Sequence, residues 1–292
     1  MIDGLERTIS VLEDIDRTPY LKELCRRYSV YDFDDKFRVI RDPISGLIHE
    51  NYDAGYFLSN YPDVLSLYGL DGGQMDQLNV DELPYLATLA CLTWHFRRDH
   101  FCEGLLTSRS IANGTLLRLF RHLRELYKSH PSISTLEELH HTNCHALPCR
   151  PGIYRVLVPE KVPVSFIESP RNLSAESYPS ALLEQKYNQC ADKSVLYIGK
   201  ANGRGGLRQR VQQYIKYGWN TAANHKGGRA VWQVENFPIL LLEYAALAHR
   251  RNCWEILLLE YEVCEDCEQR EHELLAAFKR ENGVYPLANW RG

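Results

Sequence analysis

The sequence predicts an α+β protein with a helical N-terminal domain, followed by a domain built on a small three-stranded antiparallel sheet flanked by helices. Two observations carry this prediction. Apolar residues recur at helical spacing in the first half of the chain, whereas short runs of β-branched and aromatic residues begin after residue 150. The length of 292 residues is also more typical of two domains than of one.

Amphipathic helices are the main signal in the N-terminal domain, which we place at residues 1–149. Apolar residues within 86–92, and again within 116–126, recur every three or four positions and so mark one face of a helix. Between residues 130 and 151 the composition shifts to Pro, His, Cys and Thr, which indicates a domain boundary there. No family resemblance is evident in this domain, and target recognition is one role that would suit it.

The C-terminal domain, residues 150–292, alternates between strands and helices. The predicted strands are 152–158, 194–199 and 254–263. The predicted helices are 207–217 and 265–281, and 236–250 is expected to be helical in part. The proline-bearing stretch 159–193 lies between the first two strands, and we interpret it as an insertion.

The bulk composition is that of an ordinary globular protein, with 45% hydrophobic and 25% charged residues. No apolar run approaches the roughly 18–20 residues that span a bilayer, and the charged N-terminus lacks the apolar run of a signal peptide. The 9 cysteines, in a chain without an export signal, indicate reduced thiols. We therefore expect a cytoplasmic protein with no membrane partner.

The net charge of −4 argues against a nucleic-acid partner, but the distribution of charge favours one. The stretch from Lys200 to Val234 contains no Asp or Glu. Its basic residues are Lys200, Arg204, Arg208, Arg210, Lys216, Lys226 and Arg229. A local patch of this kind attracts a polyanionic backbone, while a solvated basic surface is the alternative explanation.

Two tyrosines are expected on one face of the predicted sheet. Because side chains alternate along a strand, Tyr154 and Tyr197 point to one face when Ile153 and Ile198 point to the other. Tyrosines are common on strands, so this pair alone also has an ordinary structural explanation.

The predicted helices add charged groups to the same region. In the first, Arg210 and Tyr214 are one turn apart beside an apolar stripe, and Lys200 is expected at the mouth of the same surface. In the closing helix, Glu271 heads an apolar stripe, where a charge is costly unless it is paired or binds a metal. A carboxylate that complements the helix dipole is the alternative.

The triplets Gly152-Ile-Tyr154 and Tyr197-Ile-Gly199 resemble the two strands that name the GIY-YIG nuclease superfamily. The other matching residues follow in the family's order: Lys200, Arg210, Tyr214, Glu271 and Asn289. The arginine–tyrosine pair is similar to the nuclease domain of the bacterial excision-repair incision subunit. The stretch around His225 is similar to a histidine-bearing loop of some restriction-type members. The resemblance covers about residues 150–292.

The resemblance implies hydrolysis of a phosphodiester bond with one divalent metal, Mg²⁺ or Mn²⁺, held by Glu271. It also implies that Tyr197 is the general base. A tyrosine with a pKa of about 10 is a poor base at neutral pH, so Lys200 and Arg210 are expected to lower its pKa. Arg210 would also contact the phosphate in the transition state.

The remaining residues of the resemblance have supporting roles. Tyr154 and Tyr214 are expected to orient water or phosphate. His225 would assist proton transfer or substrate binding, although a lone loop histidine is often incidental. Asn289 is expected to orient its neighbours without a chemical role.

The sequence departs from the family pattern at several points. The insertion lengthens the spacing between the triplets, and the loop after the second triplet is extended. Arg208 competes with Arg210 for the arginine position, and the spacing to Tyr214 favours Arg210. Glu268 and Glu273 compete with Glu271.

Cysteines suggest a second metal as an alternative. Two of them precede the first predicted strand and two follow the third, and antiparallel pairing of these strands would bring them together in a structural Zn²⁺ site. The four residues are Cys144, Cys149, Cys264 and Cys267. Single Cys-x-x-Cys pairs are common, so Zn²⁺ remains the less favoured cofactor.

We expect an endonuclease acting on DNA, with RNA not excluded, and a second domain of its own fits restriction or defence better than repair. A non-catalytic nucleic-acid-binding module or a repair nuclease of the same fold is the alternative. Cutting both strands with one site per chain would favour a homodimer or sequential nicking. Arginines within residues 116–128 form a row that would suit DNA contact, but a solvated helix face is the simpler explanation.

Overall fold

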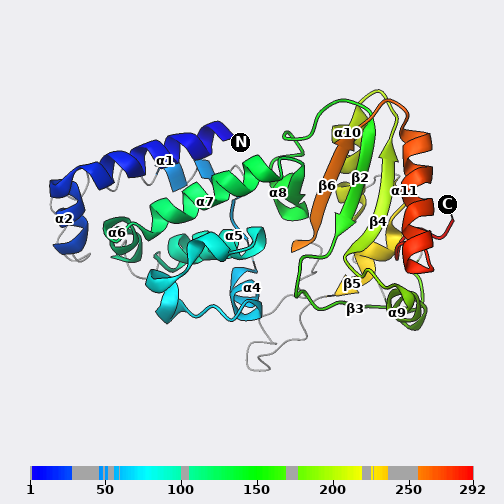
Figure 1. Cartoon of the computed structure of the whole chain (residues 1–292), viewed down its shortest axis with the longest axis horizontal. Coiled ribbons are helices and arrows are strands. Elements are labelled where there is room, and N and C mark those ends of the chain that lie inside the picture. Colours follow the sequence, from blue (N-terminus) through cyan, green and yellow to red (C-terminus); the bar gives the residue numbers. More distant parts are fainter. Residues whose placement is uncertain are drawn as a thin grey trace. The chain divides into compact units, whose positions relative to one another are not determined.

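The structure is a computed structural model that describes residues 2–27, 46–48, 50–51, 56–58, 60–99, 105–168, 177–218, 225, 227–235 and 256–291. It divides into two compact units, Met1–Pro131 and Ser132–Gly292, which are described separately (Figure 1). The α+β class predicted from the sequence is confirmed. Within the described ranges, no helix has the length and apolar character needed to cross a membrane.

The division lies at the start of the predicted transition 130–151, and not at residue 149. The reason is that residues 132–149 pack with the second unit. Strand β1 (Ile133–Thr135) joins its sheet, and helix α8 (Leu136–His141) follows directly. A strand of three residues is too short to show alternation, which explains why the sequence pattern did not reveal it.

The described part of the first unit is helical. Its α-helices are α1 (Ile2–Arg17), α2 (Pro19–Arg27), α4 (Tyr61–Leu67), α5 (Tyr85–Asp99), α6 (Leu105–Ala112) and α7 (Thr115–Ser129). Two 3₁₀ turns, η1 (Gly72–Gln77) and η2 (Val80–Glu82), precede α5. The helices predicted at 86–92 and 116–126 are therefore confirmed as α5 and α7. Their apolar stripes are buried, and α7 packs against α1 and α5.

A four-stranded antiparallel sheet, ordered β1-β6-β2-β4, organises the second unit. The three predicted strands correspond to β2 (Gly152–Leu157), β4 (Val195–Ala201) and β6 (Leu258–Val263). The predicted count of three strands is corrected to four by β1. A separate antiparallel pair, β3 (Ser165–Phe166) and β5 (Val234–Glu235), connects the insertion to the segment around residue 234.

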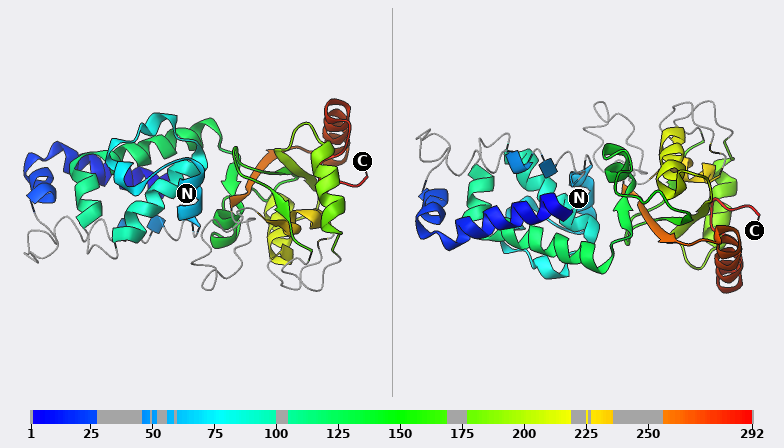
Figure 2. Two further views of the ribbon diagram at one scale, coloured as in Figure 1. Left: turned by 90° about the horizontal axis from the view of Figure 1, so that it is seen from below. Right: turned by 90° about the horizontal axis from the view of Figure 1, so that it is seen from above.

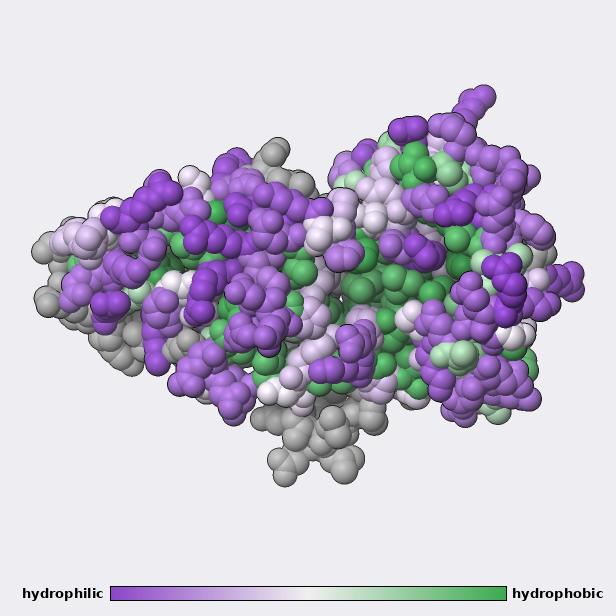
Figure 3. Space-filling model, viewed as in Figure 1, coloured by the Kyte–Doolittle hydropathy of each residue, from purple (hydrophilic) through white to green (hydrophobic). Residues whose placement is uncertain are grey.

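Helices cover both faces of this sheet. The two long ones are α10 (Gly206–Gly218) and α11 (Cys267–Asn282), both expected from the sequence, and they lie on opposite sides (Figure 2). The insertion contributes α9 (Ser180–Gln189), and the 3₁₀ turn η3 (Arg229–Gln233) precedes β5. Figure 3 shows that the outward surface of α11 is mostly hydrophilic, whereas apolar side chains gather over the strands.

The strand register decides which side chains share a face. Val156 lies opposite Tyr197 and Tyr154 lies opposite Gly199, so both tyrosines point to one face, as predicted. Ile153 and Ile198 point to the other face and form a core with Cys267 and Leu275 of α11. The expected helical part at 236–250, the start of the strand predicted at 254 and Lys226 lie outside the described residues.

Candidate active site

The glycines of the two triplets allow close packing around the sheet. A Cβ on Gly152 would lie 2.4 Å from the Glu262 carbonyl oxygen and 2.7 Å from the Leu207 side chain of α10. A Cβ on Gly199 would lie 2.7 Å from the ring of Tyr154. Since real Cβ atoms do not approach so closely, both positions require glycine. The triplets therefore have a steric basis in this fold: they let α10 and a tyrosine ring lie directly against the strands.

Three tyrosine rings meet on the α10 side of the sheet. The ring centroids of Tyr154 and Tyr197 are 5.8 Å apart, and the ring of Tyr214 lies 6.1 Å from the first and 5.9 Å from the second. Tyr154 and Tyr214 are fully buried, and Tyr197 is 7% exposed. The Tyr214 hydroxyl has no hydrogen-bond partner among the described residues. A buried hydroxyl without a partner is costly, which makes it a candidate for holding a water or a substrate oxygen.

His225 is buried beside this tyrosine cluster, and its hydrogen bonds define its tautomer. Its Nδ1 lies 2.9 Å from the carbonyl oxygen of Gly227, which can only accept, so Nδ1 carries the proton. Its Nε2 therefore accepts the hydrogen bond from the Tyr154 hydroxyl, at 2.9 Å. Burial, and then the charge of Arg210, lower the pKa of His225 from 6.5 to about 4. The imidazole is consequently neutral at pH 7 and remains a hydrogen-bond acceptor for Tyr154.

The loop that carries His225 also brings residues that the sequence analysis missed. A Cβ on Gly227 would lie 2.2 Å from the Tyr197 hydroxyl, and one on Gly228, which has φ +70°, would lie 2.8 Å from the Tyr214 ring. The Trp232 ring centroid is 4.8 Å from that of Tyr214. The Gly-Gly pair was the available signal, because adjacent glycines mark a place where backbone approaches other groups closely.

Burial dominates the ionisation of the tyrosines. It raises the pKa of Tyr154 and that of Tyr214 well above the ordinary value of 10. Burial also raises the pKa of Tyr197, although a hydrogen bond with Tyr154 and the charges of Arg210 and Lys200 act in the opposite direction. The expectation that neighbouring cations bring the pKa of Tyr197 below its ordinary value is therefore wrong for the chain alone. The two cations are in place, but desolvation outweighs them.

The two candidate arginines of α10 differ in what they contact. Arg208 donates from Nε to the Leu147 carbonyl oxygen at 2.8 Å and from Nη2 to that of His145 at 2.9 Å, so its guanidinium holds the loop before β2. Arg210 makes no hydrogen bond or ion pair with another described residue, yet its charge acts on Tyr154, Tyr197 and His225. This difference favours Arg210 as the arginine of the site.

Lys200 and Glu271 lie together on the α11 side of the sheet. Lys200 Nζ is 3.2 Å from the Glu271 carboxylate and 3.2 Å from that of Glu268. Lys200 is opposite Ile153 in the register, so the expectation that it shares the tyrosine surface is corrected. Burial alone would lower the pKa of Lys200. Hydrogen bonds with the two glutamates outweigh this effect, and the pKa is raised.

The competing glutamates are separated by their surroundings. The Glu271 side chain is 21% exposed, against 71% for Glu268, and only Glu271 acts on the pKa of Tyr197. Glu273 accepts from Gln269 at 2.8 Å and pairs with Arg270 at 3.7 Å, which places it on the outer side of α11. Glu271 is therefore the one of the three glutamates whose charge acts on Tyr197. It is paired with a lysine, as its position at the head of an apolar stripe requires.

Asn289 connects the C-terminal segment to the second triplet. Its Oδ1 accepts from the Ile198 backbone N–H at 2.9 Å, and its Nδ2 donates to the Ile198 carbonyl oxygen at 2.8 Å. The adjacent Ala288 N–H donates to the Leu196 carbonyl oxygen at 2.8 Å. Because β4 is an edge strand, these bonds satisfy backbone groups that would otherwise be unpaired and hold Tyr197 in register. The contacts are those of a positioning residue.

The other predicted nucleic-acid contacts have mixed surroundings. Arg204 is exposed and makes no ion pair with another described residue, and Lys216 is exposed at the last turn of α10. Arg208 is hydrogen-bonded to backbone carbonyl oxygens, and Arg229 is half-buried in η3. Lys226 lies outside the described residues. The basic stretch is thus neither fully buried nor fully neutralised.

The cysteines do not form the four-residue site considered as an alternative. Cys264 and Cys267 lie close, with their sulfurs 3.8 Å apart, whereas Cys144 is buried and Cys149 is exposed. Among the described residues, which include all four, no group of three or more His, Cys, Asp or Glu is placed to hold a metal ion. Ligands for a four-cysteine Zn²⁺ site are therefore not brought together.

The arginine row of the first unit is largely neutralised within that unit. Arg121 donates from Nη2 to Glu13 at 2.7 Å. Arg124 is paired with Glu6 at 3.4 Å and with Glu125 at 2.9 Å. These ion pairs favour the interpretation of a solvated, salt-bridged helix face over that of a DNA contact.

Comparison with known proteins gives one family match. A family model described as a family of unknown function, DUF6508, matches residues 71–129, from η1 to the end of α7 in the first unit. No curated protein and no solved structure matches the chain. The match falls in the region for which the sequence indicated no family, and it adds no role to it.

Proposed function

We propose that the second unit is a metal-dependent endonuclease of the GIY-YIG type that hydrolyses phosphodiester bonds in DNA. The observation that carries this proposal is the environment of Tyr197. The pKa of its hydroxyl is affected by the charge of Arg210 on one side of the sheet and by those of Lys200 and Glu271 on the other. These residues are far apart in sequence, and they are among those on which the sequence resemblance to the GIY-YIG family rests.

The donor set near Tyr197 suits a divalent cation. Glu271 and Glu268 converge on one ammonium group, that of Lys200, so the fold already places a positive charge between two carboxylates. Mg²⁺ is commonly held by one or two carboxylates together with substrate phosphate oxygens. Glu271 would hold Mg²⁺ or Mn²⁺, and the metal when bound would stabilise charge on the leaving oxygen.

The side chains have separate tasks in this proposal. Tyr197 acts as the phenolate, formed when its hydroxyl loses a proton to solvent, and accepts a proton from the attacking water. The Tyr154 hydroxyl, which donates to His225 in the resting chain, turns its hydrogen toward the Tyr197 oxygen and so stabilises the phenolate. Arg210 contacts the phosphate, where its guanidinium offsets the charge that develops in the transition state. The hydroxyl of Tyr214 holds a water or a phosphate oxygen.

A second candidate is a non-catalytic nucleic-acid-binding module of the same fold. The burial that raises the pKa of Tyr197 favours it, because a tyrosine that stays neutral is a poor base. The nuclease is preferred, since a binding module has no need for a half-buried carboxylate whose charge acts on Tyr197. A restriction-type role is preferred to repair because a separate helical unit accompanies the catalytic one, an argument by analogy.

A cleavage assay on mixed plasmid and phage DNA with Mg²⁺ or Mn²⁺ tests this function. The variants are Glu271→Ala and, as a matched control on the same helix, Glu273→Ala. We expect discrete fragments from the wild type and from Glu273→Ala and none from Glu271→Ala, which should keep its fold and bind DNA as the wild type does. Equal cleavage by all three proteins would refute the assignment of Glu271. Salt-sensitive DNA binding without cleavage by the wild type would favour the binding module.

A further inference from the structure

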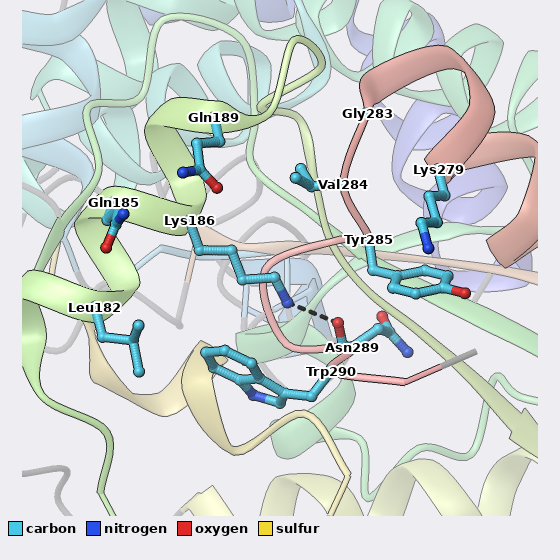
Figure 4. Close-up of a pocket in the computed structure, with 10 residues that line it drawn as sticks. All are labelled: Leu182, Gln185, Lys186, Gln189, Lys279, Gly283, Val284, Tyr285, Asn289 and Trp290. Atoms are coloured by element: carbon cyan, nitrogen blue, oxygen red, sulfur yellow. Dashed lines mark hydrogen bonds between the residues drawn. The ribbon is translucent and has the colours of Figure 1, made fainter.

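A cavity of about 350 Å³ lies between α9, the end of α11 and the C-terminal segment (Figure 4). This size is within the range of small-ligand pockets, which begins at roughly 300 Å³. The helix α9 belongs to the insertion, for which the proposed reaction has no use. The cavity therefore gives the insertion a binding surface of its own.

The lining has the composition of a nucleotide site. Two aromatic rings, from Tyr285 and Trp290, face two ammonium groups, from Lys186 and Lys279. The side-chain amides of Gln185 and Gln189 add donors and acceptors of the kind that read the edge of a base. The described residues that line the cavity include no carboxylate. A ligand with an aromatic ring and a negative charge suits this combination.

Lys186 makes the inner end of the cavity positive and rigid. Its Nζ donates to the carbonyl oxygens of Pro286 at 2.9 Å, Leu287 at 2.8 Å and Asn289 at 2.6 Å, and lies 4.2 Å from the centroid of the Trp290 ring. Figure 4 shows it reaching from α9 to the C-terminal segment. It makes no ion pair with a described carboxylate, so its charge is uncompensated. Burial accordingly lowers the pKa of Lys186 to about 8.

The rim of the cavity exposes apolar surface. Leu182 is 40% exposed and Trp290 is 39% exposed, and they are two of the three large hydrophobic residues found exposed in the described part of the chain. Trp290 is supported by a stacking contact with Tyr178, with ring centroids 4.8 Å apart. With the Tyr178 ring and the Lys186 ammonium packed against the Trp290 ring, its exposed edge adds apolar surface to the rim.

Asn289 links the cavity to β4, the strand that carries Tyr197. This residue lines the cavity, and its side chain is bonded to Ile198, the neighbour of Tyr197 in β4.

We propose that the cavity binds a base from a single-stranded segment of the nucleic-acid substrate. The base packs against the exposed edge of the Trp290 ring and against Tyr285, and the adjoining phosphate lies near Lys279. This inference rests on the proposed nucleic-acid function of the same unit. The substrate class it adds is DNA that contains an unpaired nucleotide.

Binding of a labelled oligothymidylate of about 12 nucleotides, measured by fluorescence anisotropy with EDTA present, tests the proposal. We expect Trp290→Ala to weaken binding about tenfold and Trp290→Phe, which keeps a ring, to weaken it less. Tyr20→Ala, a control at another exposed aromatic residue, should bind as the wild type does. Lys279→Gln should lower the slope of log affinity against log salt by about 0.7, the value for one phosphate contact.

An abasic oligomer of the same length separates stacking from misfolding. The wild type should bind it about tenfold more weakly than oligothymidylate, and Trp290→Ala should cause no further loss. Equal affinity of the wild type for the two oligomers would overturn the proposal, whatever the variants do. That result together with DNA cleavage would reject base binding in the cavity and keep the proposed nuclease function. Base-dependent binding without cleavage would keep base binding in the cavity and reject the nuclease function.

Discussion

Helices α7 and α10 carry the same sequence feature, arginines beside an apolar stripe, and the fold uses these arginines differently. On α7, Arg121 and Arg124 are bonded to Glu13 and Glu6 of α1. On α10, Arg210 makes no ion pair with another described residue, and its charge acts on the buried tyrosines instead. The comparison teaches that a row of basic residues is a candidate site for an anionic ligand only where the fold supplies no acidic partner.

The sequence contained this distinction in a simple form. The stretch from Lys200 to Val234 has no Asp or Glu, so α10 has no acidic neighbours within its own segment. The α7 helix includes Glu125 and packs on α1, which is rich in acidic residues. The local absence of Asp and Glu was therefore a better indicator of arginines without an acidic partner than the number of arginines was.

The largest effect is expected at Tyr197, the group on which Arg210 acts. Tyr197→Phe removes the base and should lower the single-turnover cleavage rate by about 10²–10⁴-fold. Because burial holds the pKa of Tyr197 above 10, the wild-type rate should rise about tenfold per pH unit between pH 7 and 9. Tyr187→Phe, at another tyrosine whose pKa is raised by burial, is the control and should keep the wild-type rate. A flat wild-type pH profile would exclude Tyr197 as the base.

An intermediate effect is expected from His225, which is held neutral beside Arg210. Its pKa is about 4 in the folded chain and near 6.5 when unfolded, so the unfolded chain binds the proton more readily as the pH falls. The wild type should lose stability progressively between pH 6.5 and pH 4, by about 3 kcal/mol in unfolding free energy. Denaturant unfolding at several pH values measures this loss.

The control for that experiment is His225→Gln, which keeps an acceptor for Tyr154 but does not titrate. Its stability should fall less than that of the wild type over the same pH range. Parallel losses in the two proteins would show that the protonation of His225 does not destabilise the fold.

The smallest effect is expected on α7. Glu13→Gln removes the partner of Arg121 and leaves that guanidinium available to solvent. If partner loss is what separates α7 from α10, DNA affinity at low salt should increase slightly, by about twofold, because one positive charge is released. Filter binding at two salt concentrations checks this. A decrease in affinity would show that Glu13 itself supports DNA binding.

Periodicity predicted much of the second unit. The strands β2, β4 and β6 and the helices α10 and α11 follow from alternation and apolar stripes, and so does the placement of Tyr154 and Tyr197 on one face. The short strand β1 and the domain division at Pro131 could not be predicted, because three residues carry no usable pattern.

The members of the candidate site could be named from the sequence, but its electrostatics could not be predicted. The spacing of α10 selected Arg210 over Arg208, and the contacts of both arginines agree with that choice. The pKa of Tyr197 was misjudged because its burial depends on a loop, around Gly227 and Gly228, that folds over the ring from outside the strand. Lys186 was missed because its three carbonyl partners lie in the C-terminal segment, about 100 residues away.

The most direct test of the central claim is one cleavage experiment that compares Arg210→Gln with Arg121→Gln on the same DNA under single-turnover conditions. The account predicts a loss of about 10²–10³-fold for Arg210→Gln, because its charge is directed at the phosphate, and a rate within about twofold of the wild type for Arg121→Gln, because its charge is already neutralised. Equal losses in the two variants, or a larger loss from Arg121→Gln, would contradict it.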